Sequence, residues 1–146
     1  MKKIIGQPKK TNLKLIELIK KTKINNYYIK NHEDFRKRIV EDINIDDDVL
    51  DIGKGMRDKF ENIKSKNITT VDVNDFGDYP DIIYDICSDP DETLLKKFDK
   101  IICLAVLEHV YDPFLAVKNI KLMLKENGVL YGYVPYLFYY HAPHSL

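Results

Sequence analysis

Apolar residues in the first part of the chain recur at spacings of three and four residues, which places them on one face of a helix. Leu15, Leu18 and Ile19 show this spacing in one segment, and Phe35 and Ile39 show it in the next. We therefore predict two N-terminal helices, over residues 11–24 and 32–43.

From residue 46 onward, short apolar runs alternate with segments of helical character. Strands that alternate with helices form right-handed crossovers, and these build a parallel sheet. The fold class is therefore α/β, a Rossmann-like sheet of about five strands with helices on both faces. Predicted strands cover residues 48–53, 67–73, 82–86, 100–104 and 129–137; predicted helices cover residues 56–66, 90–98 and 112–127.

The last predicted helix carries start and stop signals. Asp112 can cap its first turn, and Pro113 suits the first helical position. At the other end stand Asn127 and Gly128, and we expect the glycine to supply the left-handed residue that ends the helix.

Length and composition narrow the class of protein. The chain has 146 residues, of which 45% are hydrophobic, enough for one domain with a core. We expect a single domain over residues 1–146, with a helical arm at 1–45 and a cofactor-binding core at 46–146. No apolar run approaches the roughly 18 residues of a membrane span, and no secretory signal is recognisable. Two cysteines in apolar runs, with no metal-type spacing, favour buried thiols in a cytoplasmic protein.

The net charge of zero hides an uneven distribution. Residues 1–41 hold twelve basic and four acidic side chains, whereas residues 42–92 hold five basic and fifteen acidic ones. Only three of the basic residues are arginines, and no continuous basic stripe is present, which argues against nucleic acid as a partner. The basic arm could attract an anionic small molecule, or it could be a solvated helix face.

The first strand ends in a turn that suits a nucleotide-like ligand. Asp51 closes the strand, Gly53 and Gly55 follow, and glycine lets a backbone approach a ligand closely. Asp72 stands at the end of the second strand, where an acid can accept hydrogen bonds from a ribose diol. Asp58 occupies the position of the third glycine in a G-x-G-x-x-G dinucleotide fingerprint. The pattern indicates a nucleoside-type cofactor without choosing between NAD and others.

A later segment resembles a known family. Residues 98–113, FDKIICLAVLEHVYDP, are similar to a segment of the class I S-adenosylmethionine-dependent methyltransferases, in particular the small-molecule enzymes grouped as types 11 and 12. Residues 49–55, VLDIGKG, resemble the glycine motif of that family, and residues 125–130, KENGVL, resemble its entry into the fifth strand. The resemblance covers about residues 46–146.

This resemblance implies methyl transfer from S-adenosylmethionine to a small acceptor, anionic or sugar-linked. In the family pattern the glycines and Asp51 hold the methionine end, Asp72 the ribose, and Asp85 with Ile86 the adenine. The implied cofactor-binding residues are Asp51, Gly53, Gly55, Asp72, Val73, Asp85, Ile86, Leu104 and Ala105.

Three residues are candidates for catalysis: His109, Glu108 and His141. Histidine titrates near neutral pH and can act as a base or orient an acceptor. The alternative is a purely structural role for His109 and Glu108. His141 and His144 lack further metal-ligating partners in sequence, so no metal site is predicted.

The sequence departs from the family pattern in two ways. Lys54 and Arg57 replace small residues of the glycine motif. The family sheet has two further strands after the fifth, and we expect both to be absent here, which would leave an open edge that invites pairing. An alternative function follows: a non-catalytic, methyltransferase-like subunit or fragment that binds a second copy or another chain through that edge.

Overall fold

A computed structural model describes residues 31–54 and 62–135. The predicted helix over residues 11–24 and most of the one over 56–66 lie outside the described residues. Within the described part of the chain, no helix is long and apolar enough to cross a membrane.

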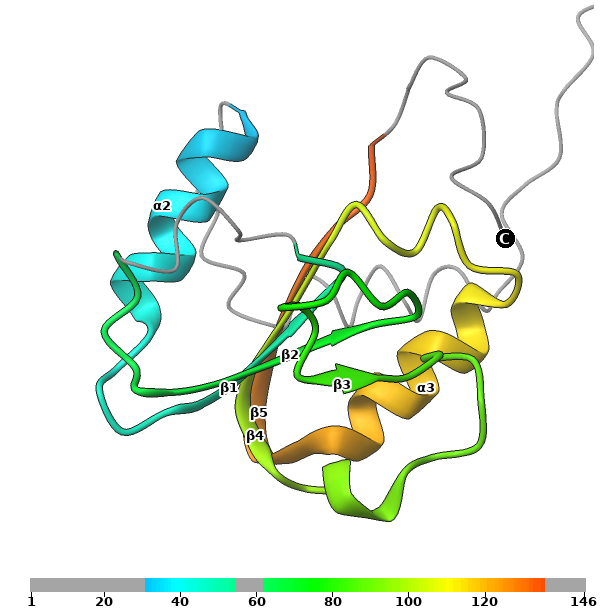
Figure 1. The fold of residues 1–146 in the computed structure, drawn as a ribbon. Coiled ribbons are helices and arrows are strands. Elements are labelled where there is room, and N and C mark those ends of the chain that lie inside the picture. Colours follow the sequence, from blue (N-terminus) through cyan, green and yellow to red (C-terminus); the bar gives the residue numbers. More distant parts are fainter. Residues whose placement is uncertain (1–30, 55–61, 136–146) are drawn as a thin grey trace, which may run out of the picture.

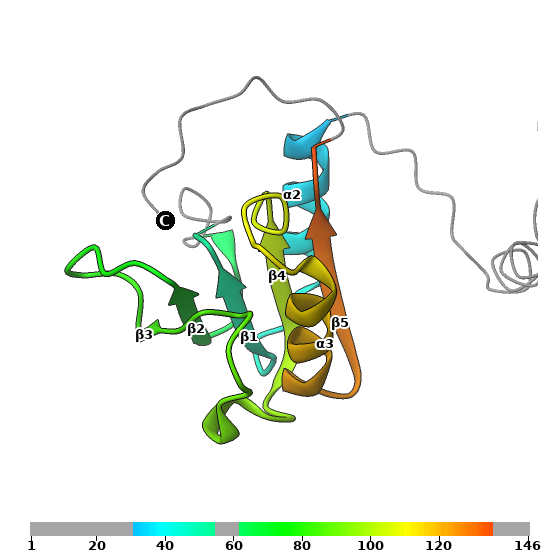
Figure 2. The same ribbon diagram turned by 90° about the vertical axis from the view of Figure 1, so that its right-hand side faces the viewer.

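Five parallel strands form one sheet in the order β3-β2-β1-β4-β5 (Figure 2). The predicted parallel α/β sheet is thus confirmed. β1 lies between β2 and β4, although β4 follows it only after two other strands. The strand order therefore reverses at β1. The strands are β1 Asp48–Ile52, β2 Asn67–Asp72, β3 Ile82–Ile83, β4 Phe98–Leu104 and β5 Leu124–Tyr133.

Two helices cover the two faces of the sheet: α2, His32–Asp42, lies on one face and α3, Pro113–Met123, on the other (Figures 1 and 2). The larger core lies on the α3 side, where Leu50, Phe98 and Ile120 are almost fully buried. A smaller core on the α2 side contains Ile39 and Ile102. The sheet thus separates two cores of different size.

Both helices begin where the sequence predicts. The side chain of Asn31 accepts a hydrogen bond of 2.9 Å from the amide of Asp34 and caps α2. Asp112 accepts from the amides of Phe114 and Leu115 at 3.1 and 2.9 Å and caps α3. Each cap satisfies amides that have no partner within the helix.

The predicted end of α3 is wrong. The helix ends at Met123, and Leu124 is already extended and paired with Phe98 in the sheet. Asn127, with φ of 65°, takes the left-handed conformation inside β5. Gly128 is needed for space, because a Cβ there would lie 3.0 Å from the backbone oxygen of Phe98.

Three other predicted elements are shorter than expected. Instead of a helix over residues 90–98 there is one turn of 3-10 helix, Glu92–Leu94, because Leu95 is extended and Lys96 is left-handed. β3 stops after Ile83 and residues 84–86 are outside it, because the side chain of Asp85 accepts the amide of Cys87 and starts a turn. Residues 63–66 are not helical and lead into β2.

Charged side chains join the elements at the amino ends of the strands. Lys125 donates to Asp48 at 2.7 Å and to Asp99 at 2.8 Å, which links the starts of β1, β4 and β5. The hydrogen bond from Lys125 holds the pKa of Asp99 below its ordinary value. On the α2 side, Asp42 bonds with Lys100 at 2.7 Å and accepts from the hydroxyl of Tyr131.

Candidate functional site

The carboxyl ends of β1, β2 and β4 meet at the point where the strand order reverses. In open α/β sheets ligands bind in the crevice outside this point. Gly53, Asp72 and Ala105 directly follow or end these three strands, and the sheet register places Ile52 opposite both Val71 and Cys103. Residues far apart in sequence therefore share one edge of the sheet.

The glycine turn needs its first glycine. Gly53 has a φ of 74°, and its amide donates to the carbonyl of Val71 at 2.9 Å. A Cβ on Gly53 would collide with the side chain of Val106 from the loop after β4. Lys54 follows with a φ of 58°, so the turn has two left-handed residues in succession. Gly55 and Arg57 lie outside the described residues.

Asp72 presents a carboxylate at the end of β2. One oxygen, Oδ1, accepts the amide of Asn74 at 3.0 Å, which fixes the side chain in a turn. Among the described residues, Oδ2 accepts no hydrogen bond, and the residue is half-buried. Val73 beside it is 61% exposed and offers an apolar surface at the same place. The carboxylate of Asp72 can accept hydrogen bonds from a diol, and the side chain of Val73 can pack against a flat ring.

Asp85 and Ile86 lie just after β3 rather than inside it as predicted, and they differ in accessibility. Asp85 is half-buried, and its Oδ1 accepts the amide of Cys87 at 2.8 Å. Ile86 is only 4% exposed and packs in the α3-side core. A contact between Ile86 and a ligand ring stays a prediction. Because the Ile86 side chain is buried, it is better placed to support the site from the core.

Asp51 and Leu104, at the ends of β1 and β4, are buried. Asp51 is fully enclosed, so any contact with a ligand would run through the backbone, through water or through a rearranged side chain. Ala105 is exposed, with a φ of 55°, and its amide donates to the carbonyl of Tyr133 at 2.9 Å. That bond anchors the loop after β4 on β5.

His109 and Glu108 lie in this same loop. Nε2 of His109 is 4.0 Å from Oε1 of Glu108, and the histidine side chain is 53% exposed. The amide of His109 donates to the carbonyl of Val106 at 2.9 Å, so the loop is closed by a turn. His141 lies outside the described residues. The geometry leaves the His109 imidazole accessible to an acceptor.

Both thiols are enclosed in the core. Cys87 and Cys103 are free and buried. Burial, with a contribution from the charge of Asp51, raises the pKa of Cys103 to about 12. A thiol in this state stays protonated and is a poor nucleophile or metal ligand. No cluster of three metal-ligating side chains is present among the residues described.

Comparison with known proteins identifies the family. Residues 48–132, more than half of the chain, match a family model described as "Methyltransferase domain". The chain belongs to this family. The resemblance to class I S-adenosylmethionine-dependent methyltransferases is therefore confirmed.

A ubiquinone biosynthesis O-methyltransferase of Histophilus somni is 47% identical to this methyltransferase domain over 36 residues. That match covers 25% of this chain and 15% of the relative, so the chain spans a small part of the curated protein's length. A putative methyltransferase of Bacillus halodurans has the same fold, with a TM-score of 0.53 and 17% identity over 66% of this chain and 47% of the other.

A second solved structure has an equally distant sequence. The putative methyltransferase that was crystallised with the Haloferax volcanii Trm112 methyltransferase activator has a TM-score of 0.50 and 17% identity, covering 66% of this chain and 49% of the other. At such identities these two structures confirm the fold alone.

The sequence analysis missed the loop between β2 and β3, residues 73–81, which lies beside the methyltransferase glycine turn. Tyr79 is 6% exposed, and the ammonium of Lys54 lies 4.4 Å above its ring. Phe76, 59% exposed, stacks against Tyr79 with ring centroids 5.9 Å apart. The signal available in the sequence was the pair of aromatic residues, Phe76 and Tyr79, shortly after Asp72.

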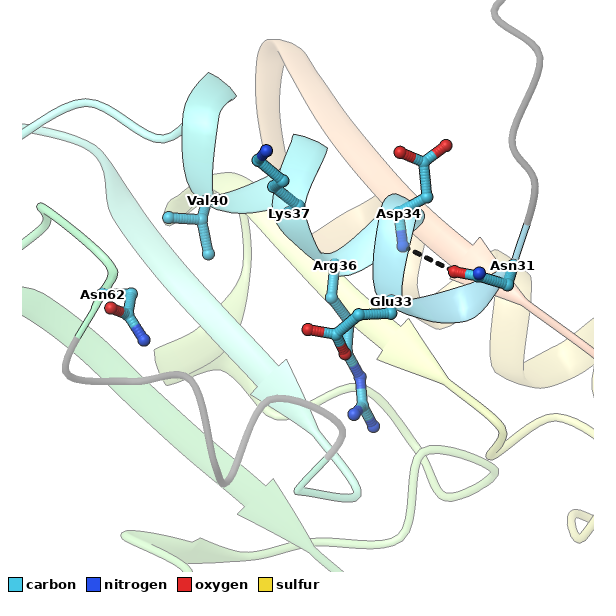
Figure 3. A pocket seen from close by; sticks show the side chains of 7 residues that line it. All are labelled: Asn31, Glu33, Asp34, Arg36, Lys37, Val40 and Asn62. Atoms are coloured by element: carbon cyan, nitrogen blue, oxygen red, sulfur yellow. Dashed lines mark hydrogen bonds between the residues drawn. The ribbon is translucent and has the colours of Figure 1, made fainter.

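A separate hollow of about 520 Å³ lies beside α2 (Figure 3). Figure 3 shows Glu33 and Arg36 reaching into the same space, with Asn62 across from Val40. None of the residues at the strand ends lines it. Its lining carries charges of both signs, from Glu33, Asp34, Arg36 and Lys37, and it lies apart from the strand ends.

Proposed function

We propose that this chain binds S-adenosylmethionine at the carboxyl ends of β1, β2 and β4 and transfers its methyl group to a small-molecule acceptor. The observation that carries the proposal is the meeting of Gly53, Asp72 and Ala105 at one edge of the sheet, where its strand order reverses. When bound, the donor supplies an electrophilic methyl group together with its own thioether leaving group.

The residues at this edge fit such a donor. Gly53 makes the left-handed turn after β1 possible, with Val106 of the β4 loop packed where a side chain would stand. The available oxygen of Asp72 can accept a ribose hydroxyl, and the exposed Val73 can pack on a purine ring. Asp85 can accept from an exocyclic amine with its Oδ2. These roles support the donor over a ligand without a nucleoside.

For the transfer itself, the domain has to orient two reactants and keep water away, because the donor is already activated. His109 is an accessible titratable side chain in the loop after β4, and the carboxylate of Glu108 lies 4.0 Å from its Nε2. We assign His109 to proton removal from the acceptor. The 36-residue similarity to an O-methyltransferase supports an acceptor hydroxyl.

A calorimetric titration of the full chain with S-adenosylhomocysteine and, separately, with NAD tests the donor. We expect saturable heat with the first ligand only. Asp72→Ala should weaken that binding by about tenfold or more, because a hydrogen-bonded carboxylate contact is lost. Asp75→Ala is the matched control, since Asp75 makes the same kind of turn with the amide of Gly77 at 2.8 Å. Binding of NAD alone would overturn the proposal.

A second candidate is a non-catalytic subunit that pairs through β5. Within the described residues, β5 pairs with β4 and is the outer strand of the sheet, where a further strand could add. Sedimentation of the full chain tests this. A dimer that Tyr133→Lys disperses, with no S-adenosylhomocysteine binding, would favour the second candidate over the first.

A further inference from the structure

The turn after β1 and the loop after β2 are joined through a single carbonyl. The oxygen of Val71 accepts the amide of Gly53 at 2.9 Å and the hydroxyl of Tyr79 at 3.4 Å. A carbonyl oxygen has two lone pairs, and both are used here. The glycine turn and the far end of the 73–81 loop are therefore held to the same atom.

Tyr79 also contacts the turn through its ring. Nζ of Lys54 lies 4.4 Å from the ring centroid, within the range of a cation–π interaction. Lys54 stands where the family pattern has a small residue, and its backbone is left-handed. The ring of Tyr79 thus gives the ammonium group of Lys54 a defined partner in the neighbouring loop.

The same tyrosine organises its own loop. Its carbonyl accepts the amide of Phe76 at 2.7 Å, and the ring packs beside that of Phe76. Just beyond, Asp81 accepts both the amide and the hydroxyl of Thr70 at 2.7 Å. The loop is therefore fastened to β2 at Thr70 and at Val71.

Asp72 and Val73 directly follow the fastening point at Val71, and Tyr79 is buried although Val73 and Phe76 are exposed. A buried tyrosine in a mostly exposed loop indicates that its position matters. We infer that Tyr79 is a positioning residue of the donor site: it ties the turn carrying Gly53 to the end of β2 that carries Asp72, so that both contact the donor together. The inference rests on the proposed function and extends it to a residue that does not itself touch the donor.

Three variants of the full chain test this role. Tyr79→Phe keeps the ring and removes the hydroxyl, Tyr79→Leu removes both, and Lys54→Met keeps the aliphatic stem without the charge. Tyr131→Phe is the matched control, because it removes a tyrosine hydroxyl contact in mid-sheet, away from the strand ends.

We expect Tyr79→Phe to weaken S-adenosylhomocysteine binding by about threefold to tenfold, the range for one lost hydrogen bond, and Tyr79→Leu to weaken it further. Lys54→Met should weaken it by about two- to fivefold in the wild-type background and have no further effect combined with Tyr79→Leu. In turnover, the donor KM should rise while kcat at saturating donor stays constant. The control should bind as the wild type does.

Amide hydrogen exchange of Gly53 without ligand gives a second readout, and it should quicken in both Tyr79 variants but not in the control. The wild type could bind S-adenosylhomocysteine while folded Tyr79→Phe and Tyr79→Leu bind it with the same affinity. That result would overturn the role of Tyr79 and leave the proposed function standing. A wild-type chain that gives no heat with S-adenosylhomocysteine would overturn the proposed function and the role that rests on it.

Discussion

The side chain of Val106 occupies the space above the α-carbon of Gly53, so the loop after β4 closes directly over the turn after β1. This contact joins two strand ends that are more than fifty residues apart in sequence. A ligand that approaches Gly53 therefore meets the β4 loop at the same time, and the two segments form one surface.

Gly53→Ala should destabilise the fold by roughly 2 to 4 kcal/mol, because it combines a left-handed backbone with overpacking. Urea unfolding followed by circular dichroism measures the change. Adding Val106→Ala should recover the overpacking part and leave the backbone part. Gly132→Ala is the control, since nothing lies within 4 Å of a Cβ there. An equal loss in both glycine variants would contradict the close approach at Gly53.

Lys125→Met should lower stability most between about pH 4.5 and pH 10. The pKa of Asp99 is lowered by Lys125, so its contribution is lost as the pH falls through that lowered value. The pKa of Lys125 is raised by Asp48 and Asp99, so the contribution is also lost as the pH rises above it. Urea midpoints of the two proteins should converge at both extremes. The control is Lys121→Met, which replaces an exposed lysine of α3. The stability difference between this variant and the wild type should not depend on pH in this way.

Cys103 should resist alkylation in the folded protein up to about pH 9, because its pKa is raised to about 12 by burial. Mass spectrometry after iodoacetamide treatment checks this, with urea-unfolded protein as the positive control. Modification of Cys103 in folded protein at pH 8 would show that the strand-end core opens more readily than its packing indicates.

His109→Gln should reduce kcat by about 10²-fold or more if the imidazole removes the acceptor proton, since general-base catalysis contributes about that much. Its affinity for S-adenosylhomocysteine should be unchanged, because His109 is proposed to act on the acceptor and not to hold the donor. Glu108→Gln should have a smaller effect of the same kind. A His109 variant with full kcat would leave the residue only a structural role.

The strands could be predicted from the sequence because buried parallel strands are continuous apolar runs. Residues such as Val49, Leu50 and Ile101 are fully buried, and the continuous apolar runs that contain them leave few alternatives to a buried strand. The glycine turn and Asp72 were placed for the same reason, since each directly follows such a run. Periodicity and strand ends together give the fold and the position of the site.

Local turns explain most of what was missed. Asp85 accepts the amide of Cys87 and starts a turn that stops β3 early, and the left-handed Lys96 ends the predicted helix after one turn. The left-handed residue expected at Gly128 is Asn127 instead. Such choices depend on rival contacts of similar energy, so composition does not decide them.

Tyr79 was missed for a different reason. Its partners, Lys54 and Val71, are 25 and 8 residues away in sequence, and only the parallel pairing of β1 with β2 brings them together. Two aromatic residues in a polar loop carry no periodic signal. Residues that connect two loops of a site are accordingly the hardest to find from a single sequence.

The unequal cores on the two sides of the sheet imply a hierarchy of local unfolding. In the described part of the chain, twelve buried residues form the α3-side cluster and six form the α2-side cluster. Transient detachment of α2 would uncover only the smaller cluster, while β1, β2 and β4 kept their packing against α3. The carboxyl ends of these three strands are where we propose that the donor binds. They can therefore stay folded while α2 is locally unfolded.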